Sequence, residues 1–152
     1  MNLLLFVYDK LRKDFSESEP LAKMLAMRAT HRGQASVLAT LFDLGDFPAI
    51  ISSPTQDTKA SGITSRVLGD LYEINSLNIV AQLDKHYQTP HLFLREKTMI
   101  FRKGEIIDGE YYRFVGISPD PILVHTGDYS SYIKKRMNPS GVYIKPDMPS
   151  AP

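Results

Sequence analysis

The chain opens with an unbroken apolar run, Leu3–Val7, which gives way to a polar loop. A short apolar run that stops at a turn predicts a strand buried in the core. Because such a strand fixes the position of its own end, the loop that follows it is a favoured place for binding or catalytic residues. We therefore expect Tyr8, Asp9, Lys10 and Leu11 to lie together at one defined point of the fold.

Length and composition narrow the class of protein. The 152 residues suit a single domain with a sizeable core, which we place at residues 1–137, followed by a Pro-rich tail over 138–152. The formal net charge of +1 gives no electrostatic reason to expect nucleic acid or an anionic membrane as a partner. The chain has no cysteine, which excludes disulfides, thiolate metal sites and a cysteine nucleophile.

Targeting signals are not evident in the sequence. The N-terminal apolar run is too short for the core of a signal peptide, and no basic region precedes it. No stretch is long enough to span a bilayer. The expected location is the cytoplasm, with no membrane partner.

Hydrophobic periodicity and turn residues predict helices and strands in mixed order. A first helix is expected to start within 16–20 and to close at Gly33. A second helix should start at a Ser76 cap. Its inward face, at helical spacing, is predicted to consist of Leu77, Val80, Leu83 and Tyr87.

The predicted strands are 34–44, 66–74, 92–102 and 110–117, with turns at 45–48 and at Asp108–Gly109. The segment 52–65 is rich in Ser, Thr, Pro and Gly and predicts a loop. A short helix is expected after Thr126–Asp128.

Familiar catalytic and cofactor motifs are absent. No pair among the four histidines has the spacing of two metal ligands on one helix face: His31, His86, His91 and His125. Phosphate loops, dinucleotide fingerprints and serine nucleophile elbows are also missing. We therefore expect no metal and no cofactor.

Six segments resemble, in order, the motifs of the gamma-glutamylcyclotransferase-like family. Residues 6–12 resemble the family's opening strand and Tyr-Gly-x-Leu loop, and Leu44–Ala49 resembles its Leu-Gly-x-Tyr-Pro-Ala segment. Leu68–Ile74 is similar to its Gly-Glu-Leu-Tyr-Glu-Val strand, and Leu83–Gln88 to its Leu-Asp-x-Tyr-Glu-Gly segment. Phe93–Arg95 resembles Tyr-x-Arg, and Gly127–Tyr129 resembles Gly-Asp-Trp. Each motif is weak alone, but six in the family's order are fairly specific for the fold.

The resemblance implies a mixed α/β (α+β) fold, with a curved or barrel-like sheet and flanking helices. Family enzymes cyclise a γ-glutamyl group to 5-oxoproline and release an amine, and one carboxylate takes and then gives the proton. Backbone N–H groups of the Gly-containing loop hold the polar end of the substrate. Carried over to this chain, the resemblance predicts a pocket for a γ-glutamyl amine or a related small molecule, lined by Tyr8, Asp9, Lys10, Leu11 and Arg95.

Two residues depart from the family pattern. The catalytic Glu aligns with Tyr87, whose phenol, with an ordinary pKa of about 10, is a poor base near neutrality. The loop Gly aligns with Asp9, which adds bulk and negative charge where the family binds a carboxylate. We therefore expect a small-molecule pocket with lost or altered cyclotransferase activity, in which Tyr87 holds the catalytic position.

Two alternatives follow from the same residues. One is an active cyclotransferase-type enzyme with a changed substrate and an unidentified base, and the other is a non-catalytic protein-interaction module with a filled pocket. We expect the Tyr8–Leu11 loop and Tyr87 to line one cleft. Arg95 should lie near this cleft and pair with Asp9, because a carboxylate added beside a pocket needs a partner.

Overall fold

Strand β1 (Leu3–Val7) is buried on both faces, which explains its unbroken apolar sequence. Leu3, Leu5 and Val7 pack in a cluster that includes side chains of the flanking helices. Phe6 points the opposite way, into a second cluster with members from all five strands of a barrel. The predicted first strand is confirmed, and its end is held from both sides.

The five strands close into a barrel in the order β1-β5-β2-β6-β7. The other members are β2 (Thr30–Leu38), β5 (Arg66–Ile74), β6 (Phe93–Arg102) and β7 (Glu105–Phe114). Neighbouring strands pair antiparallel, except that β1 meets β7 in parallel and so closes the ring. The expected mixed α/β fold with a barrel-like sheet is confirmed.

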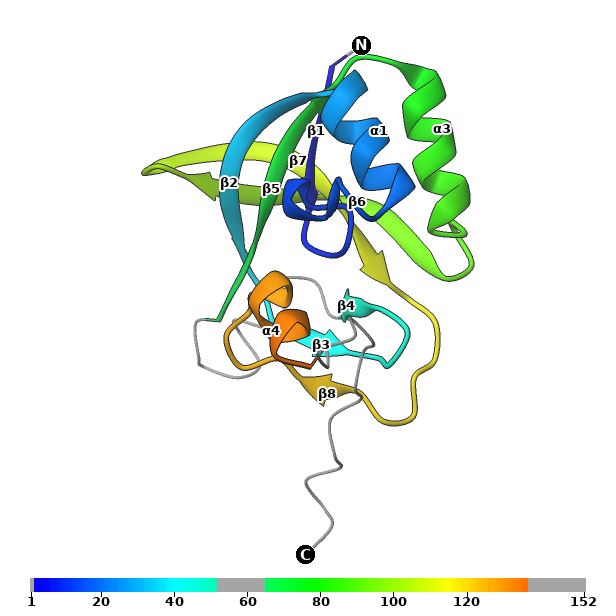
Figure 1. The fold of residues 1–152 in the computed structure, drawn as a ribbon, viewed down its shortest axis with the longest axis vertical. Coiled ribbons are helices and arrows are strands. Elements are labelled where there is room, and N and C mark those ends of the chain that lie inside the picture. The colour runs from blue at the N-terminus through cyan, green and yellow to red at the C-terminus, as the bar shows by residue number, and fades with distance from the viewer. Residues whose placement is uncertain (1, 52–64, 137–152) are drawn as a thin grey trace, which may run out of the picture.

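Two helices, α1 (Pro20–Arg28) and α3 (Leu77–His86), lie side by side at one end of the barrel (Figure 1). As predicted, Ser76 caps α3, because its Oγ accepts a hydrogen bond from the backbone N–H of Ile79 at 3.4 Å. The prediction that Leu77 faces inward is wrong, since this side chain is 71% exposed. It lies two residues before the buried Ile79, which places it almost on the opposite side of the helix.

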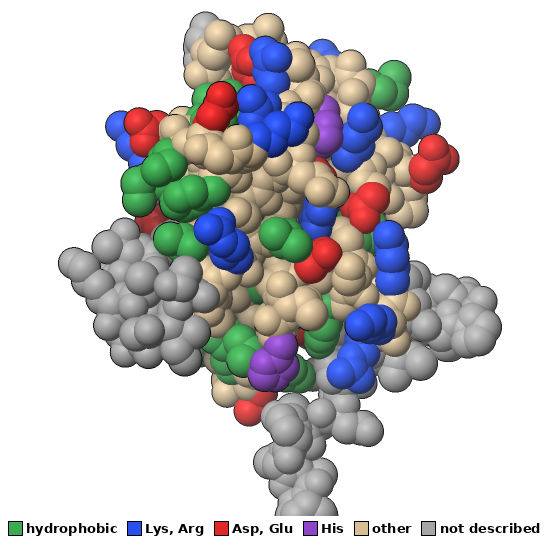
Figure 2. All heavy atoms as spheres, turned by 90° about the vertical axis from the view of Figure 1, so that its left-hand side faces the viewer, with side chains coloured by type: hydrophobic (Ala, Val, Ile, Leu, Met, Phe, Trp, Pro, Cys, Tyr) green, Lys and Arg blue, Asp and Glu red, His purple; other side chains and the backbone are tan. Residues whose placement is uncertain are grey.

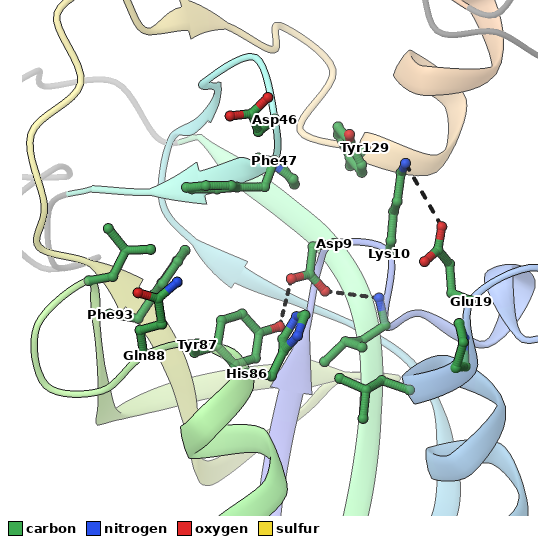
Figure 3. Close-up of a pocket in the computed structure, with 15 residues that line it drawn as sticks. Asp9, Lys10, Glu19, Asp46, Phe47, His86, Tyr87, Gln88, Phe93 and Tyr129 are labelled. Carbon is green, nitrogen blue, oxygen red and sulfur yellow. Dashed lines mark hydrogen bonds and ion pairs between the residues drawn. The ribbon is translucent and has the colours of Figure 1, made fainter.

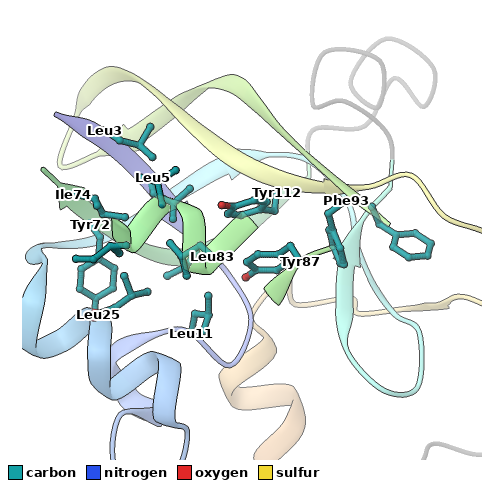
Figure 4. Close-up of a cluster of buried hydrophobic side chains, with 14 of the residues drawn as sticks. Leu3, Leu5, Leu11, Leu25, Tyr72, Ile74, Leu83, Tyr87, Phe93 and Tyr112 are labelled. Carbon is teal, nitrogen blue, oxygen red and sulfur yellow. The ribbon is translucent and has the colours of Figure 1, made fainter. Parts of the chain in front are cut away.

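The space between barrel and helices is filled by apolar side chains. Figure 4 shows Leu83 of α3 and Leu25 of α1 near Leu5 and Ile74 of the barrel. These four side chains are 0% exposed. Truncating one to Ala would cost about 2–5 kcal/mol.

A three-stranded sheet lies at the other end of the barrel, in the order β4-β3-β8 (Figure 1). Its strands are β3 (Leu41–Asp43), β4 (Pro48–Ile50) and β8 (Ile122–Leu123). Helix α4 (Tyr129–Arg136) packs here, with Tyr129 and Ile133 buried in the same cluster as Phe6. The first strand therefore runs from the end covered by α1 and α3 toward the small sheet, and the loop after it lies between the two.

Two predictions for the second strand are wrong. Gly33 does not close a helix, since it lies inside β2 with φ of 100°. There the pairing register shifts between His31 and Gln34, and a glycine suits this bulge. The segment 34–44 is also not one strand, because its alternating pattern continues from β2 into β3, which belongs to the other sheet.

The turn predicted at Asp108–Gly109 is wrong as well, because both residues lie within β7, which ends at Phe114. A Cβ on Gly109 would meet the carbonyl oxygen of Leu4 at 2.7 Å. This glycine therefore permits close approach of β1 and β7 rather than a turn.

The computed structural model describes residues 2–51 and 65–136. The predicted loop, apart from Ser65, and the tail over 138–152 lie outside them. Within the two described ranges, no helix is long and apolar enough to cross a membrane, and no group of three or more His, Asp or Glu side chains is placed to hold a metal ion. On the face that Figure 2 shows, basic and acidic side chains are interspersed.

Candidate functional site

A pocket of about 450 Å³ lies where the loop after β1 meets the end of α3 (Figure 3). The loop contributes Asp9, Lys10 and Leu11, and the helix end contributes His86 and Tyr87. This volume is in the usual range of small-molecule sites. The remaining lining residues come from the start of α1, the β3–β4 turn, the segment between α3 and β6, the start of β6 and the start of α4: Glu19, Pro20, Leu21, Asp46, Phe47, Pro48, Gln88, Leu92, Phe93 and Tyr129.

Asp9 shapes the loop that follows β1. Its backbone carbonyl accepts a hydrogen bond from the N–H of Arg12 at 3.1 Å. Its carboxylate Oδ1 accepts one from the N–H of Leu11 at 3.0 Å. Asp and Asn favour such turns because their side chains bond to backbone groups two residues on. The Asp9 carboxylate is thus already hydrogen-bonded to a backbone N–H group of the loop, that of Leu11.

Tyr87 is positioned by the way helix α3 ends. The N–H of Gln88 donates to the carbonyl of Lys85, and the N–H of Thr89 donates to the carbonyl of Asp84. This pair of bonds is the Schellman pattern, which requires a left-handed residue just past the helix cap. Gln88 takes that conformation with φ of 51°, where glycine is the usual residue. Tyr87 is the cap residue itself and is 5% exposed, against the pocket.

The centre of the site is a hydrogen bond between the side chains of Asp9 and Tyr87. The Tyr87 hydroxyl donates to Asp9 Oδ2 at 2.6 Å (Figure 3). Burial raises the pKa of the Asp9 carboxyl above its ordinary value, although the hydrogen bonds from Tyr87 and Leu11 oppose this rise. Burial and the neighbouring Asp9 carboxylate raise the pKa of Tyr87 well above 10.0. Tyr87 is therefore a hydrogen-bond donor at neutral pH and not a base.

Aromatic stacking fixes the ring of Tyr87. It lies against Tyr112 of β7 with centroids 4.0 Å apart and planes at 17°, and Phe93 meets it edge-on at 5.0 Å (Figure 4). The Tyr112 hydroxyl in turn donates to Asp84 Oδ1 at 2.6 Å. The side chain at position 87 therefore has little freedom to leave the pocket.

Arg95 does not pair with Asp9, so that prediction is wrong. Its guanidinium bonds to Asp84 Oδ1 at 3.1 Å and to Glu110 Oε1 at 2.8 Å. Arg95 stands opposite Tyr112 in the β6–β7 register, and two nearby carboxylates already neutralise it. It is not among the residues that line the pocket.

Tyr8 is also outside the lining, although it adjoins Asp9 in the chain. Its side chain is buried, and its hydroxyl donates to the Tyr112 carbonyl at 2.7 Å and accepts from the N–H of Ile50 at 3.2 Å. These bonds tie the end of β1 to β7 and β4. The structure thus brings Asp9, Lys10, Leu11 and Tyr87 together and gives Tyr8 a structural place beside them.

Arg12 anchors the loop, a role that the sequence reasoning did not assign. It is 5% exposed and pairs with Asp128 at 2.9 Å and with Asp70 at 3.5 Å. Asp70 also accepts the backbone N–H of Lys13, at the start of the short helix η1 (Lys13–Phe15), at 2.9 Å. A polar Asp70 within an apolar strand was the available signal for a buried ion pair.

A closed five-stranded barrel with a pocket at the end of its first strand is the architecture that the six motifs imply. A family model described as gamma-glutamyl cyclotransferase, AIG2-like, matches residues 5–131. The chain therefore belongs to the gamma-glutamyl cyclotransferase, AIG2-like family. No curated protein sequence matches it.

Solved structures share this fold. An AIG2-like protein from Mus musculus matches with a TM-score of 0.67 at 18% identity, over 96% of this chain and 97% of that one. YkqA from Bacillus subtilis matches with a TM-score of 0.65 at 24% identity, over 91% of this chain but 44% of YkqA. A gamma-glutamyl cyclotransferase matches with a TM-score of 0.53 at 14% identity, over 76% of this chain and 68% of that one. At these identities the likeness shows the fold alone.

Proposed function

We propose that the protein binds a small molecule in the pocket beside Asp9 and Tyr87, and that its cyclotransferase activity toward simple γ-glutamyl amino acids is lost or altered. The observation that carries this proposal is the 2.6 Å hydrogen bond from the Tyr87 hydroxyl to the Asp9 carboxylate. This bond joins the two residues at which the chain departs from the family pattern. Asp9 adds negative charge where the family binds a carboxylate, and Tyr87 replaces the family's base with a phenol.

Cyclisation of a γ-glutamyl group requires a base for the ammonium proton and an acid for the leaving amine. Tyr87 cannot take the ammonium proton near neutrality, because its pKa is raised well above that of a free phenol. Loss of general acid–base help typically slows a reaction by about 10²–10⁴-fold. We accordingly expect 5-oxoproline release far below that of an ordinary enzyme.

A second candidate function is favoured by the Asp9 carboxyl. It lines the pocket, and burial raises its pKa toward the range of a useful base. An enzyme with a changed substrate would then use Asp9 where the family uses a carboxylate on the helix. The open volume beside Tyr87 supports both small-molecule candidates over an interaction module with a filled pocket.

The test is 5-oxoproline release from a panel of γ-glutamyl amines. The samples are the wild type, Tyr87→Glu, Asp9→Gly and the double variant, each confirmed as folded by circular dichroism. We expect no useful turnover by the wild type, little by either single variant, and a gain in the double variant, which regains both a helix carboxylate and a free loop amide. Turnover by the wild type that Asp9→Asn abolishes would overturn the first candidate and support the second.

A further inference from the structure

We propose that the pocket takes an organic cation: a primary amine on an apolar body, with no free carboxylate beside the amine, and with Asp9 as its counter-ion. This inference rests on the proposed small-molecule pocket and specifies the chemical class of its ligand. It differs from the amino-acid-like substrates that the family pattern implies, because here the chain itself supplies the carboxylate.

The backbone amide of the loop already has a partner within the chain. The N–H of Leu11 is already bonded to Asp9 Oδ1 at 3.0 Å. A ligand carboxylate entering the same corner would lose this donor and would face the negative charge of Asp9. An ammonium group meets neither penalty, since a carboxylate has about four acceptor sites and only two are used by Leu11 and Tyr87.

Acidic side chains outnumber basic ones around the cavity. Three carboxylates line it, those of Asp9, Glu19 and Asp46. The cations in the lining are Lys10 and, when protonated, His86, and Lys10 Nζ lies 3.9 Å from Glu19. Formal acidic charge therefore exceeds basic charge, which favours a cationic ligand over an anionic one.

The lining also offers a hydroxyl and aromatic surface. Tyr129 lines the cavity, and a tyrosine hydroxyl can accept a hydrogen bond from a ligand N–H group. Phe47 and Phe93 supply aromatic surface for the apolar body, and aromatic rings also attract ammonium groups.

The experiment compares three probes that differ in one group: 2-phenylethylamine, 2-phenylethanol and 3-phenylpropanoate. Binding to the full chain is followed by NMR chemical shifts of the pocket residues at neutral pH. We expect the amine to bind more tightly than the alcohol, and the carboxylate to bind most weakly. Asp9→Asn, which keeps the shape and removes the charge, should weaken amine binding at least tenfold.

The matched control is Glu105→Gln, which removes one negative charge from the exposed β6–β7 turn and should leave all three affinities unchanged. Asp9→Gly should tighten binding of the carboxylate probe by freeing the Leu11 amide. The cationic ligand is refuted if the alcohol or the carboxylate binds the wild type as well as the amine does, or if Asp9→Asn leaves the amine affinity unchanged. In either case the proposed small-molecule pocket is retained. If none of the probes moves pocket resonances at millimolar concentration, the small-molecule pocket fails as well.

Discussion

Replacing Tyr87 by Phe isolates the hydrogen bond at the centre of the site. The variant keeps the ring that stacks on Tyr112 at 4.0 Å and loses the hydroxyl that donates to Asp9 at 2.6 Å. Hydrogen bonds to charged groups contribute about 1.5–3 kcal/mol to stability. Because the pocket lets water reach Asp9 in place of the lost hydroxyl, we expect the lower end of this range, a decrease of about 1.5 kcal/mol in the free energy of unfolding. For a chain of this size such a loss lowers Tm by about 3–6 °C.

The loss should depend on pH in a defined direction. Burial raises the pKa of Asp9, and the hydrogen bond from Tyr87 lowers it. Removing the hydroxyl therefore raises this pKa further, by about one unit for each 1.4 kcal/mol taken from the ionised form. The difference in unfolding free energy between wild type and variant should be largest above the folded pKa of Asp9 and should shrink as the pH falls through it.

Urea unfolding of both proteins at a series of pH values measures this difference. Tyr111→Phe is the control, because it also removes a buried tyrosine hydroxyl that donates to a carboxylate, that of Glu96 at 3.0 Å. Glu96 keeps its ion pair with Arg113 at 2.7 Å in that variant. A Tyr87→Phe loss that stays constant across pH, or that matches the control in its pH profile, would refute the coupling between Tyr87 and Asp9.

Three further predictions concern stability. Asp9→Asn should become more stable relative to wild type as the pH rises from about 4, the pKa of Asp in an unfolded chain. The raised folded-state pKa of Asp9 contributes stability to wild type at a pH below the unfolded-state pKa, and this stability is lost as the pH rises through the folded-state pKa. A difference in unfolding free energy that stays flat in urea unfolding across pH would contradict this. Gly69→Ala should lose about 1–3 kcal/mol or more, because its Cβ would meet the Val7 carbonyl oxygen, and a Tm equal to that of wild type would contradict the contact. Arg12→Gln should lose about 3 kcal/mol by breaking the buried pairs with Asp70 and Asp128, and a loss below about 0.5 kcal/mol in thermal unfolding would show that the loop needs no such anchor.

Local signals in the sequence predicted the parts of the fold that depend on local physics. The apolar run of β1, the strand over 66–74 and the Ser76 cap are set by residues next to one another in the chain. The errors at Gly33 and Gly109 have another origin, since Gly33 supplies the positive φ at a bulge in β2 and Gly109 leaves room for β1 beside β7. A glycine looks the same in a sequence whether it ends an element or allows another strand to approach.

The candidate site divides in the same way. The order of the motifs led to the prediction that Asp9 and Tyr87 line one cleft. In the structure their side chains are hydrogen-bonded to each other. The pairing of Arg95 with Asp9 was wrong because its partners, Asp84 and Glu110, depend on how α3 packs on the barrel and on the β6–β7 register, which the sequence does not specify. Phe47, Phe93 and Tyr129 lie within motif segments, so those segments were the available signal for the rest of the lining.

The contact between Asp9 and Tyr87 means that the two departures from the family pattern explain each other. A carboxylate added to the loop needs a hydrogen-bond donor, and a phenol at the helix end provides one at 2.6 Å. Tyr87→Glu alone would place a second carboxylate within reach of Asp9, where two like charges raise a pKa and destabilise the fold. Asp9→Gly alone would leave the buried hydroxyl of Tyr87 without its partner. The pair therefore behaves as one unit whose single substitutions are not additive, and this is why recovery of the family reaction is expected from the double variant and not from either change alone.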